Sequence, residues 1–295
     1  MATVSSGTTS ERFGFVQRFR SELGAVLLCK WLNVSKSGFY AWLKREESQR
    51  SVTDKSLKIL IKRIYRESKE RYGSPRIYKA LKAQGYCIGR KRVERLMRES
   101  GLVARVTRVT RRAPGTNRFK ARGENRLLEH GNAKEINQVW VADVTYLKVR
   151  GNWQYLATVM DQYSRRILGW SLSSTRTTRL STDALKYALK KRGYPKDIIF
   201  HTDRGVEFTG HVFQELLNKY GFKHSLNRPG LCTDNAFMES FYHSLKGELI
   251  RGAVYKCVAD LRSALSTYTN QFYNAVRLHS GLNYLSPIEY ERSLV

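Results

Sequence analysis

The spacing of apolar positions divides the chain into a helical first part and a strand-rich second part. In residues 17–46 apolar side chains recur at helical intervals, and Ser35 can cap a helix that carries Phe39 and Trp42 on one side. Two short helices joined by a tight turn are typical of helix-turn-helix units. Residues 1–50 are therefore predicted to form an N-terminal helical segment of this kind, and the pattern leaves open whether it contacts DNA or only packs.

A second helix-turn-helix unit is predicted over residues 52–104. Its middle helix begins with Ser74 as N-cap and Pro75 at the first helical position, where the missing N–H costs nothing. Its third helix turns apolar residues inward and carries basic residues elsewhere on its surface. On the second helix of a turn motif, such charges are better explained by phosphate and groove contacts than by a solvated face. These candidate DNA-binding residues are Lys91, Arg92, Arg95 and Arg98.

Residues 105–133 are predicted to form a basic linker. The segment 105–126 has little apolar periodicity, and Glu124 is its one acidic residue among many arginines and lysines. Such a segment orders when it binds a polyanion. Arg111 and Arg112 in this linker are therefore predicted to contact DNA.

Residues 134–295 change to an alternation of strands and helices. Residues 137–149 and 153–173 are rich in β-branched and aromatic side chains. Gly151-Asn152 separates these two runs and the polar stretch 161–165 divides the second, which predicts three antiparallel strands. A helix, a strand, a helix, a short strand and a long helix follow. This order gives a mixed α/β sheet and is typical of RNase H-like nucleases. We therefore expect an RNase H-like catalytic domain with a C-terminal helical extension, preceded by the all-α domains.

The charge balance requires a polyanionic partner. The net charge is +28, with 31 basic and 11 acidic residues in the first 130 positions and 22 and 14 in the remainder. Excess cations gain free energy by displacing the counterions of nucleic acid. The four cysteines have the spacing of neither a zinc site nor a disulfide framework. No apolar run could span a membrane and no secretory signal is found, so we expect a cytoplasmic, nucleoid-associated protein with no membrane partner.

Three acidic residues fall at positions that the predicted sheet would bring together. Asp143 lies within the first strand, Asp203 ends the fourth, and Glu239 lies in a helix with 35 residues between it and Asp203. Ligands of open α/β sheets bind at the carboxyl ends of strands, and adjacent first and fourth strands would place the two aspartates side by side. Lys246 lies two helical turns after Glu239 on the same predicted face. That face is expected to carry Asn235, Glu239, Tyr242 and Lys246, with Phe237, Phe241, Leu245 and Leu249 inward.

Clustered carboxylates repel one another and favour a bound cation. Mg²⁺ prefers carboxylate and phosphate oxygens, and two ions about 4 Å apart can activate a nucleophile and stabilise a leaving oxygen. A magnesium site of two ions, with Mn²⁺ as a substitute, is therefore predicted at Asp143, Asp203 and Glu239.

Other polar residues near these motifs have structural explanations. Asp161 fits a hairpin turn, Asp234 a helix N-cap and Glu207 a solvated loop. His201 is better explained by packing or by support of the site than by catalysis. Arg204 is expected to contact either DNA or neighbouring acids.

Motifs that follow one another in a fixed order resemble a known family. WVADVTYL, YLATVMDQYSRRILGW, HTDRGVEFT, SLNRPGLCTDNAFMESFYHSLKGELI and YNAVRLHSGLNYLSPIEYE are similar to the OrfB-type catalytic subunit of retroviral-integrase-like DDE insertion-sequence transposases. RYGSPRIYKALKAQGYCIGRKRVERLMRESGL resembles the helix-turn-helix domain of the same family. The resemblance begins near residue 20 and covers nearly the whole remaining chain. Pro229 departs from the family pattern in the loop before Glu239.

The resemblance implies a function and a set of site residues. Asp143, Asp203 and Glu239 would be the metal-binding triad, and Lys246 would contact DNA near the cleaved end. Asn235, on the same predicted helix face, is also a candidate for contact with DNA. The implied reaction is Mg²⁺-dependent hydrolysis at the 3′ ends of an element, followed by attack of the 3′-OH on target DNA. Expected partners are double-stranded DNA, further copies of this chain on that DNA, and an upstream-frame protein as fusion or partner.

Three alternatives remain open at this stage. One is an RNase H-like metal nuclease that cuts without strand transfer. Another is a DNA-binding regulator with a decayed catalytic domain, which the presence of all three acids disfavours. The third is a covalent recombinase using Tyr242 beside His243, for which no arginine-rich pocket is evident.

Overall fold

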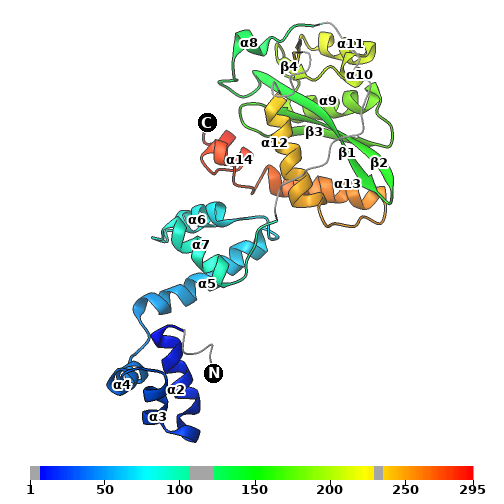
Figure 1. The fold of residues 1–295 in the computed structure, drawn as a ribbon. Helices are drawn as coiled ribbons and strands as arrows, with labels where there is room; N and C mark the ends of the chain where they lie inside the picture. The colour runs from blue at the N-terminus through cyan, green and yellow to red at the C-terminus, as the bar shows by residue number, and fades with distance from the viewer. Residues whose placement is uncertain (1–6, 106–122, 229–234, 295) are drawn as a thin grey trace. The chain divides into compact units, whose positions relative to one another are not determined.

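The computed structural model describes residues 7–105, 123–228 and 235–294. The chain divides into two compact units, residues 1–63 and 64–295 (Figure 1). Within the described ranges, no helix is long and apolar enough to cross a membrane. Four residues discussed above lie outside the described ranges, namely Arg111, Arg112, Pro229 and Asp234.

The N-terminal unit is helical, as predicted. Ser35 caps a helix and accepts a hydrogen bond from Gly38 N–H over 3.2 Å, which confirms the capping prediction. The helix over residues 9–23 was not anticipated, although Thr8 and Glu11 form the reciprocal capping box that is typical of a helix N-terminus. The helices of this region are α2 (Thr9–Leu23), α3 (Ala25–Trp31), α4 (Lys36–Lys44) and α5 (Gln49–Glu67), the last of which continues into the second unit.

The second unit begins with the end of α5, followed by α6 (Ser74–Ala83) and α7 (Arg90–Glu99). Gly73 rather than Ser74 is the N-cap of α6, because the helix begins one residue earlier than predicted. On α7, Lys91 and Arg98 are exposed, whereas Arg92 and Arg95 are half-buried. The inward residues of α7 are those predicted, Val93, Leu96 and Met97.

A five-stranded mixed sheet forms the centre of the second unit, in the order β3-β2-β1-β4-β5. The first three strands are antiparallel, and β4 and β5 run parallel to β1. This confirms the predicted RNase H-like α/β fold. The strands are β1 (Val139–Val149), β2 (Asn152–Asp161), β3 (Ile167–Ser173), β4 (Ile199–Thr202) and β5 (Lys223–Leu226).

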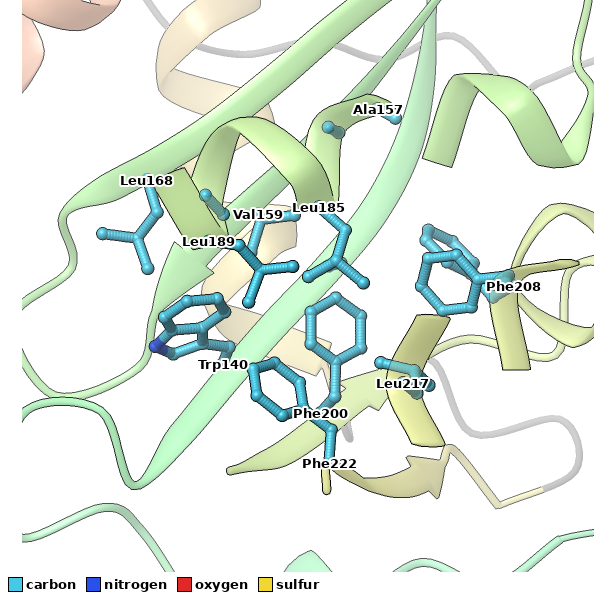
Figure 2. Packing of buried hydrophobic residues seen from close by; sticks show 14 of the residues in the cluster. Trp140, Ala157, Val159, Leu168, Leu185, Leu189, Phe200, Phe208, Leu217 and Phe222 are labelled. Atoms are coloured by element: carbon cyan, nitrogen blue, oxygen red, sulfur yellow. The ribbon is translucent and has the colours of Figure 1, made fainter. Parts of the chain in front are cut away.

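Helices cover both faces of this sheet (Figure 1). On one face, helices α9 (Thr178–Arg192), α10 (Val206–Thr209) and α11 (His211–Lys219) bury a core that includes Trp140, Phe200, Phe213 and Phe222 (Figure 2). Gly169 of β3 permits the close approach of α9, since a Cβ there would lie 2.2 Å from the Ala184 carbonyl oxygen. Helix α12 (Ala236–Leu245) packs against β1.

The segment after α12 is π-helical, and this changes which side chains face inward. In η2 (Lys246–Ile250) Glu248 is buried, at 1% exposure, whereas Leu249 is only half-buried. The prediction of Leu249 inward was wrong because each wider π-turn rotates the following residues around the helix axis. The remaining elements are α8 (Leu127–His130), α13 (Val258–Ser266), η3 (Thr267–Tyr273), η4 (Ser280–Leu282) and α14 (Pro287–Arg292).

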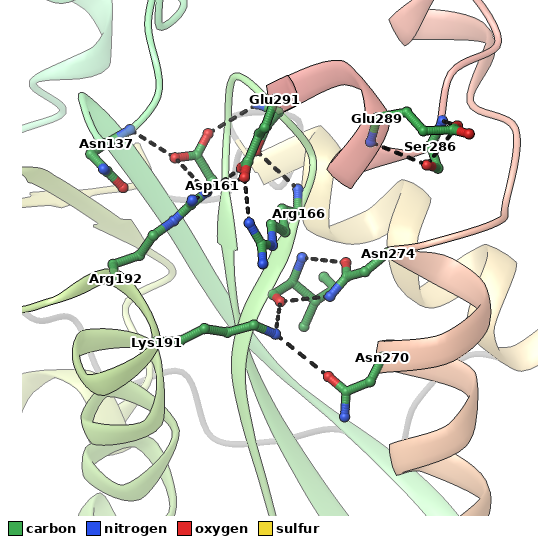
Figure 3. A network of polar contacts seen from close by, with 12 residues as sticks. Asn137, Asp161, Arg166, Lys191, Arg192, Asn270, Asn274, Ser286, Glu289 and Glu291 are labelled. Carbon is green, nitrogen blue, oxygen red and sulfur yellow. Dashed lines mark hydrogen bonds and ion pairs between the residues drawn. The ribbon is translucent and has the colours of Figure 1, made fainter. Parts of the chain in front are cut away.

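The turn between β2 and β3 is fixed to the C-terminal helix by charged side chains. Asp161 accepts backbone hydrogen bonds from Asn137 and Ser164, at 2.8 and 2.9 Å, which confirms its predicted role in the turn. Arg166 and Arg192 both hold the carboxylate of Glu291 in α14 (Figure 3). The end of the chain is thereby attached to the catalytic sheet.

Candidate active site

Two aspartates lie where the first and fourth strands separate. β1 pairs with β4 only through residues 139–141, so Asp143 lies just beyond the paired region and Asp203 directly follows β4. Trp140 and Ala142 face the core under α9. Because side chains alternate along a strand, Asp143 faces the opposite side, toward α12. The predicted adjacency of the first and fourth strands is confirmed.

The two carboxylates interact electrostatically. Burial raises the pKa of Asp143 well above its ordinary value, and the charge of Asp203 raises it further. Burial also raises the pKa of Asp203. Backbone N–H groups offset part of this effect, since Val144 donates to Asp143 over 2.7 Å and Gly205 to Asp203 over 3.0 Å. The remaining repulsion favours a proton or a cation between them.

Glu207 is a third acidic side chain beside this pair, and its predicted solvated position is wrong. It is fully buried in α10, where Arg176 donates to its Oε1 from Nε at 2.9 Å and from Nη2 at 2.6 Å. After burial, the charge of Glu207 is the next cause that raises the pKa of Asp203, and it adds to the effects of burial and of the Asp203 charge on the pKa of Asp143. The one feature of the sequence that is related to this burial is Gly205. A Cβ at this position would lie 2.6 Å from the Glu207 carboxylate, so the absence of a side chain leaves room for it.

Two side chains near Glu239 support β1 from the α12 side. Asn235 is 3% exposed and donates from Nδ2 to the Ala142 carbonyl over 3.0 Å. The Tyr242 hydroxyl donates to the Asp143 carbonyl over 2.5 Å. These contacts hold the strand that carries Asp143, and the predicted contact of Asn235 with DNA stays a prediction. They also remove the covalent-recombinase alternative, since burial raises the pKa of Tyr242 well above its ordinary value.

Glu239 and Lys246 lie at opposite ends of α12. Glu239 is exposed in the first turn, directly after residues that lie outside the described ranges. Lys246 is half-buried, and its Nζ lies 4.6 Å from the centre of the Tyr146 ring. Burial lowers the pKa of Lys246, and the charge of Asp143 partly offsets that change. Lys246 therefore reaches the surroundings of Asp143.

The donor atoms at this position suit a hard divalent cation. Asp143 and Asp203 supply carboxylate oxygens whose repulsion is not fully compensated, and Glu207 Oε2 is buried without a hydrogen-bond partner among the described residues. Carboxylate oxygens are the ligands that Mg²⁺ prefers. Over the same described residues, however, no three His, Cys, Asp or Glu side chains converge as metal ligands. The structure thus brings Asp143 and Asp203 together, with the Glu207 carboxylate beside them.

Residues beside Asp203 support the strand that leads to it. His201 is fully buried, with Nδ1 2.9 Å from Ser225 Oγ, as expected for a supporting residue. Arg204 donates to the backbone carbonyls of Asn227 and Gly123, at 2.7 and 3.0 Å. These bonds fix the loop that follows Asp203, and the expected contact of Arg204 with DNA or acids stays a prediction.

His224 on β5 should make stability depend on pH. Gln214 donates to its Nδ1, and its Nε2 lies 2.9 Å from Thr202 Oγ1, which itself donates to the Asp203 carbonyl. This pattern requires a neutral ring, and burial lowers the pKa of His224 to about 4. Between about pH 6.5 and 4 the unfolded chain binds a proton that the folded chain does not. The free energy of unfolding should therefore decrease by about 1.4 kcal/mol for each unit by which the pH is lowered.

Urea unfolding at pH 7 and pH 4.5 checks this expectation. The free energy of unfolding should decrease between pH 7 and pH 4.5 by about 2–3 kcal/mol less in His224→Gln than in the wild-type protein, because glutamine does not titrate. His211→Gln is the matched control, since His211 is exposed. An equal pH dependence in wild type and His224→Gln would contradict the assignment.

Comparison with known protein families identifies both parts of the second unit. An HTH-like domain matches residues 52–110, and integrase core domains match residues 133–232 and 220–287. The transposase InsF for insertion sequence IS3A of Escherichia coli is 36% identical over 286 residues, which cover 95% of this chain and 98% of InsF. The chain belongs to the insertion-sequence transposase family that includes InsF. DNA transposition is therefore its function, and the enzyme class is that of DDE polynucleotidyl transferases.

The chain is also similar to a protein of another insertion element and to solved viral integrase structures. A 31 kDa protein of insertion element IS600 from Shigella sonnei is 34% identical over 88% of this chain and 96% of its own length. Among solved structures, the HTLV-2 integrase catalytic core in complex with magnesium is 21% identical over 52% of this chain and 96% of that one, with a TM-score of 0.41. A simian T-cell lymphotropic virus intasome chain is 18% identical over 60% of each chain, with a TM-score of 0.47.

Proposed function

We propose that Asp143, Asp203 and Glu239 together hold the Mg²⁺ ions of this transposase, and that Mn²⁺ can replace them. The observation that carries the proposal is the buried pair of aspartates on adjacent strands, whose repulsion a divalent cation would relieve. Glu239 supports it by position, since α12 packs on β1 beside Asp143. Bound cations would supply charge neutralisation and activate the attacking hydroxyl at this site.

The proposed reaction has two phosphoryl-transfer steps. Water attacks the phosphorus at the end of the element, which breaks the bond to the 3′ oxygen and releases a free 3′-OH. That hydroxyl then attacks a target phosphodiester, so one bond forms while another breaks and no oxidant or reductant is needed. Lys246 contacts the phosphate next to the reacting group, because its ammonium lies near Asp143.

DNA binding in this proposal rests mainly on the basic helices and linker. Double-stranded DNA of the element ends and of the target lies against α7 and the following segment, and at least two copies of the chain act together on the bound ends. An upstream-frame protein is a further proposed partner, and the site of action is the cytoplasmic nucleoid. The contacting residues proposed are Lys91, Arg92, Arg95, Arg98, Arg111 and Arg112.

A strand-transfer assay tests the proposed function. The substrate is a labelled duplex with the inverted repeat that flanks the gene, mixed with plasmid target DNA and either Mg²⁺ or EDTA. We expect joined products with Mg²⁺ and with Mn²⁺, and none with EDTA. Nicking without joined products would instead favour a simple metal nuclease, and DNA binding without either product would favour a regulator.

A further inference from the structure

The hairpin formed by β1 and β2 projects past the catalytic aspartates and carries an aromatic strip. β1 pairs with β4 only through residues 139–141, whereas it pairs with β2 to the end of the hairpin at Val149 and Asn152. Beyond residue 141, β1 pairs with no second strand among the described residues, and the Ala142 and Asp143 carbonyls there bond to Asn235 and Tyr242. A strand of DNA held at the aspartates would pass along this part of the hairpin.

Four side chains in this region form a continuous series of contacts. Lys148 lies directly opposite Trp153 in the antiparallel register, so both side chains project from one face. The Lys148 Nζ lies 5.3 Å from the centre of the Trp153 ring, and the Trp153 and Tyr146 rings are 5.2 Å apart at 84°. Tyr146 in turn lies 4.6 Å from Lys246 Nζ. We call Lys148, Trp153, Tyr146 and Lys246 the aromatic strip.

The strip has the chemistry of a surface that binds single-stranded nucleic acid. Such surfaces combine cations that hold the backbone with exposed aromatic rings on which bases stack. Trp153 is 41% exposed, and its edge packs against Tyr146. The two lysines at the ends of the strip leave phosphates within reach on both sides of the rings.

We propose that the aromatic strip binds an unpaired segment of the DNA strand at the cleaved end, with one base stacked on Trp153 and the flanking phosphates held by Lys148 and Lys246. The proposal rests on the proposed function, because that function brings the DNA end to Asp143. Tyr146 acts as a positioning residue, since its ring holds the ammonium of Lys246 at the end of the strip that is nearer Asp143. The site takes a base without regard to its identity, because every base presents an aromatic face.

Photo-crosslinking tests the stacked base at the level of single residues. The full chain is mixed in EDTA with a duplex that carries a short single-stranded tail containing 5-iodouracil, irradiated, digested with trypsin and analysed by mass spectrometry. We expect a crosslink in the peptide of residues 151–165 at Trp153. Crosslinks confined to other peptides would overturn the proposal.

Variants separate stacking from a contribution to folding. Trp153→Ala should abolish the crosslink and weaken binding of the tailed duplex by roughly 5- to 150-fold, while Trp153→Phe retains most of the binding. Lys148→Gln should lower the slope of log K against log salt by about 0.7. Tyr187→Ala is the matched control, because Tyr187 is an exposed aromatic residue of α9, and it should change neither quantity.

The outcomes are distinguishable from a failure of the proposed function. Strand transfer by wild type together with unchanged tail binding by folded Trp153→Ala would reject the strip and leave the transposase mechanism intact. A crosslink at Trp153 without any strand transfer would support the strip and reject the proposed reaction. Thermal melting of each variant checks that the protein is folded, since removal of one exposed ring should cost only about 1 kcal/mol.

Discussion

Asp203→Asn is expected to abolish Mg²⁺-dependent cleavage and strand transfer while DNA binding is retained. The substitution keeps the shape of the side chain and its acceptor oxygen for Gly205 N–H, but it removes one of the three negative charges proposed to hold the Mg²⁺ ions. Loss of several kcal/mol of charge stabilisation in the transition state corresponds to a decrease in rate of about a thousandfold or more. The rates of end nicking and of joined product measure this effect.

Stability measurements distinguish this result from unfolding. Because the pKa of Asp203 is raised by burial, its ionised form at pH 7 opposes folding, and Asp203→Asn should leave the melting temperature unchanged or higher. Asp183→Asn is the control, since Asp183 forms only a surface pair with Arg179 at 3.8 Å. Loss of DNA binding together with cleavage would contradict the separation of binding and chemistry.

Glu248→Gln is expected to destabilise the second unit by about 3–5 kcal/mol, because it leaves buried arginines without their counterion. Arg277 donates to both Glu248 oxygens at 2.8 to 3.1 Å, and Tyr268 donates to Oε2 at 2.9 Å. Arg76 in the first turn of α6 lies 3.8 Å from the same carboxylate. For a unit of this size we expect a fall in melting temperature of about 6–20 °C.

The surroundings of Glu248 also join the helix-turn-helix region to the catalytic domain. We call Glu248, Arg277, Tyr268 and Arg76 the Glu248 cluster. Arg71 donates to the Glu248 carbonyl over 3.2 Å, and the Tyr72 hydroxyl bonds to the backbone of Val276 and Leu278 at 3.0 Å. Loss of the carboxylate should therefore loosen this contact as well as the catalytic domain. Protease sensitivity of residues 64–104 in the folded variant measures that second effect.

A double variant tests whether the unpaired charge is the cause. Replacing Arg277 with Met in the Glu248→Gln background removes both members of the closest pair, and part of the stability should return because the Arg277 charge is no longer buried without a counterion. Glu135→Gln is the control, since Glu135 is exposed. Equal losses from Glu248→Gln and from the control would show that the cluster contributes no net stability.

Much of the fold was predictable because it follows from local periodicity. Residues close together in the sequence determine the inward stripe of α7 and the Ser35 cap. The three antiparallel strands likewise depend on neighbouring segments of the chain. The order of strands and helices then predicted the mixed sheet, and the adjacency of β1 and β4 followed from it. The aspartates were placed correctly for the same reason, since each is fixed to a strand.

Failures occurred where a side chain's position depends on segments distant in the chain. Glu207 looked like a solvated loop residue, but Arg176 and the space left by Gly205 bury its charge beside the aspartates. Asn235 was placed on the helix face opposite the inward stripe, whereas its side chain is buried and its amide donates to β1. Neither interaction leaves a periodic pattern in the sequence.

The sequence alone determined the class of this protein. Ordered motifs, spaced acids and a strong excess of positive charge are properties of the chain that no packing can alter, and they predict a DNA transposase of RNase H-like fold. Only the tertiary structure decided which charged groups are buried together, where the π-helical turn moves Glu248 inward, and how Lys246 reaches Tyr146 and Asp143. The physical reason is that burial and electrostatic energies depend on distances in space between groups that the chain keeps far apart.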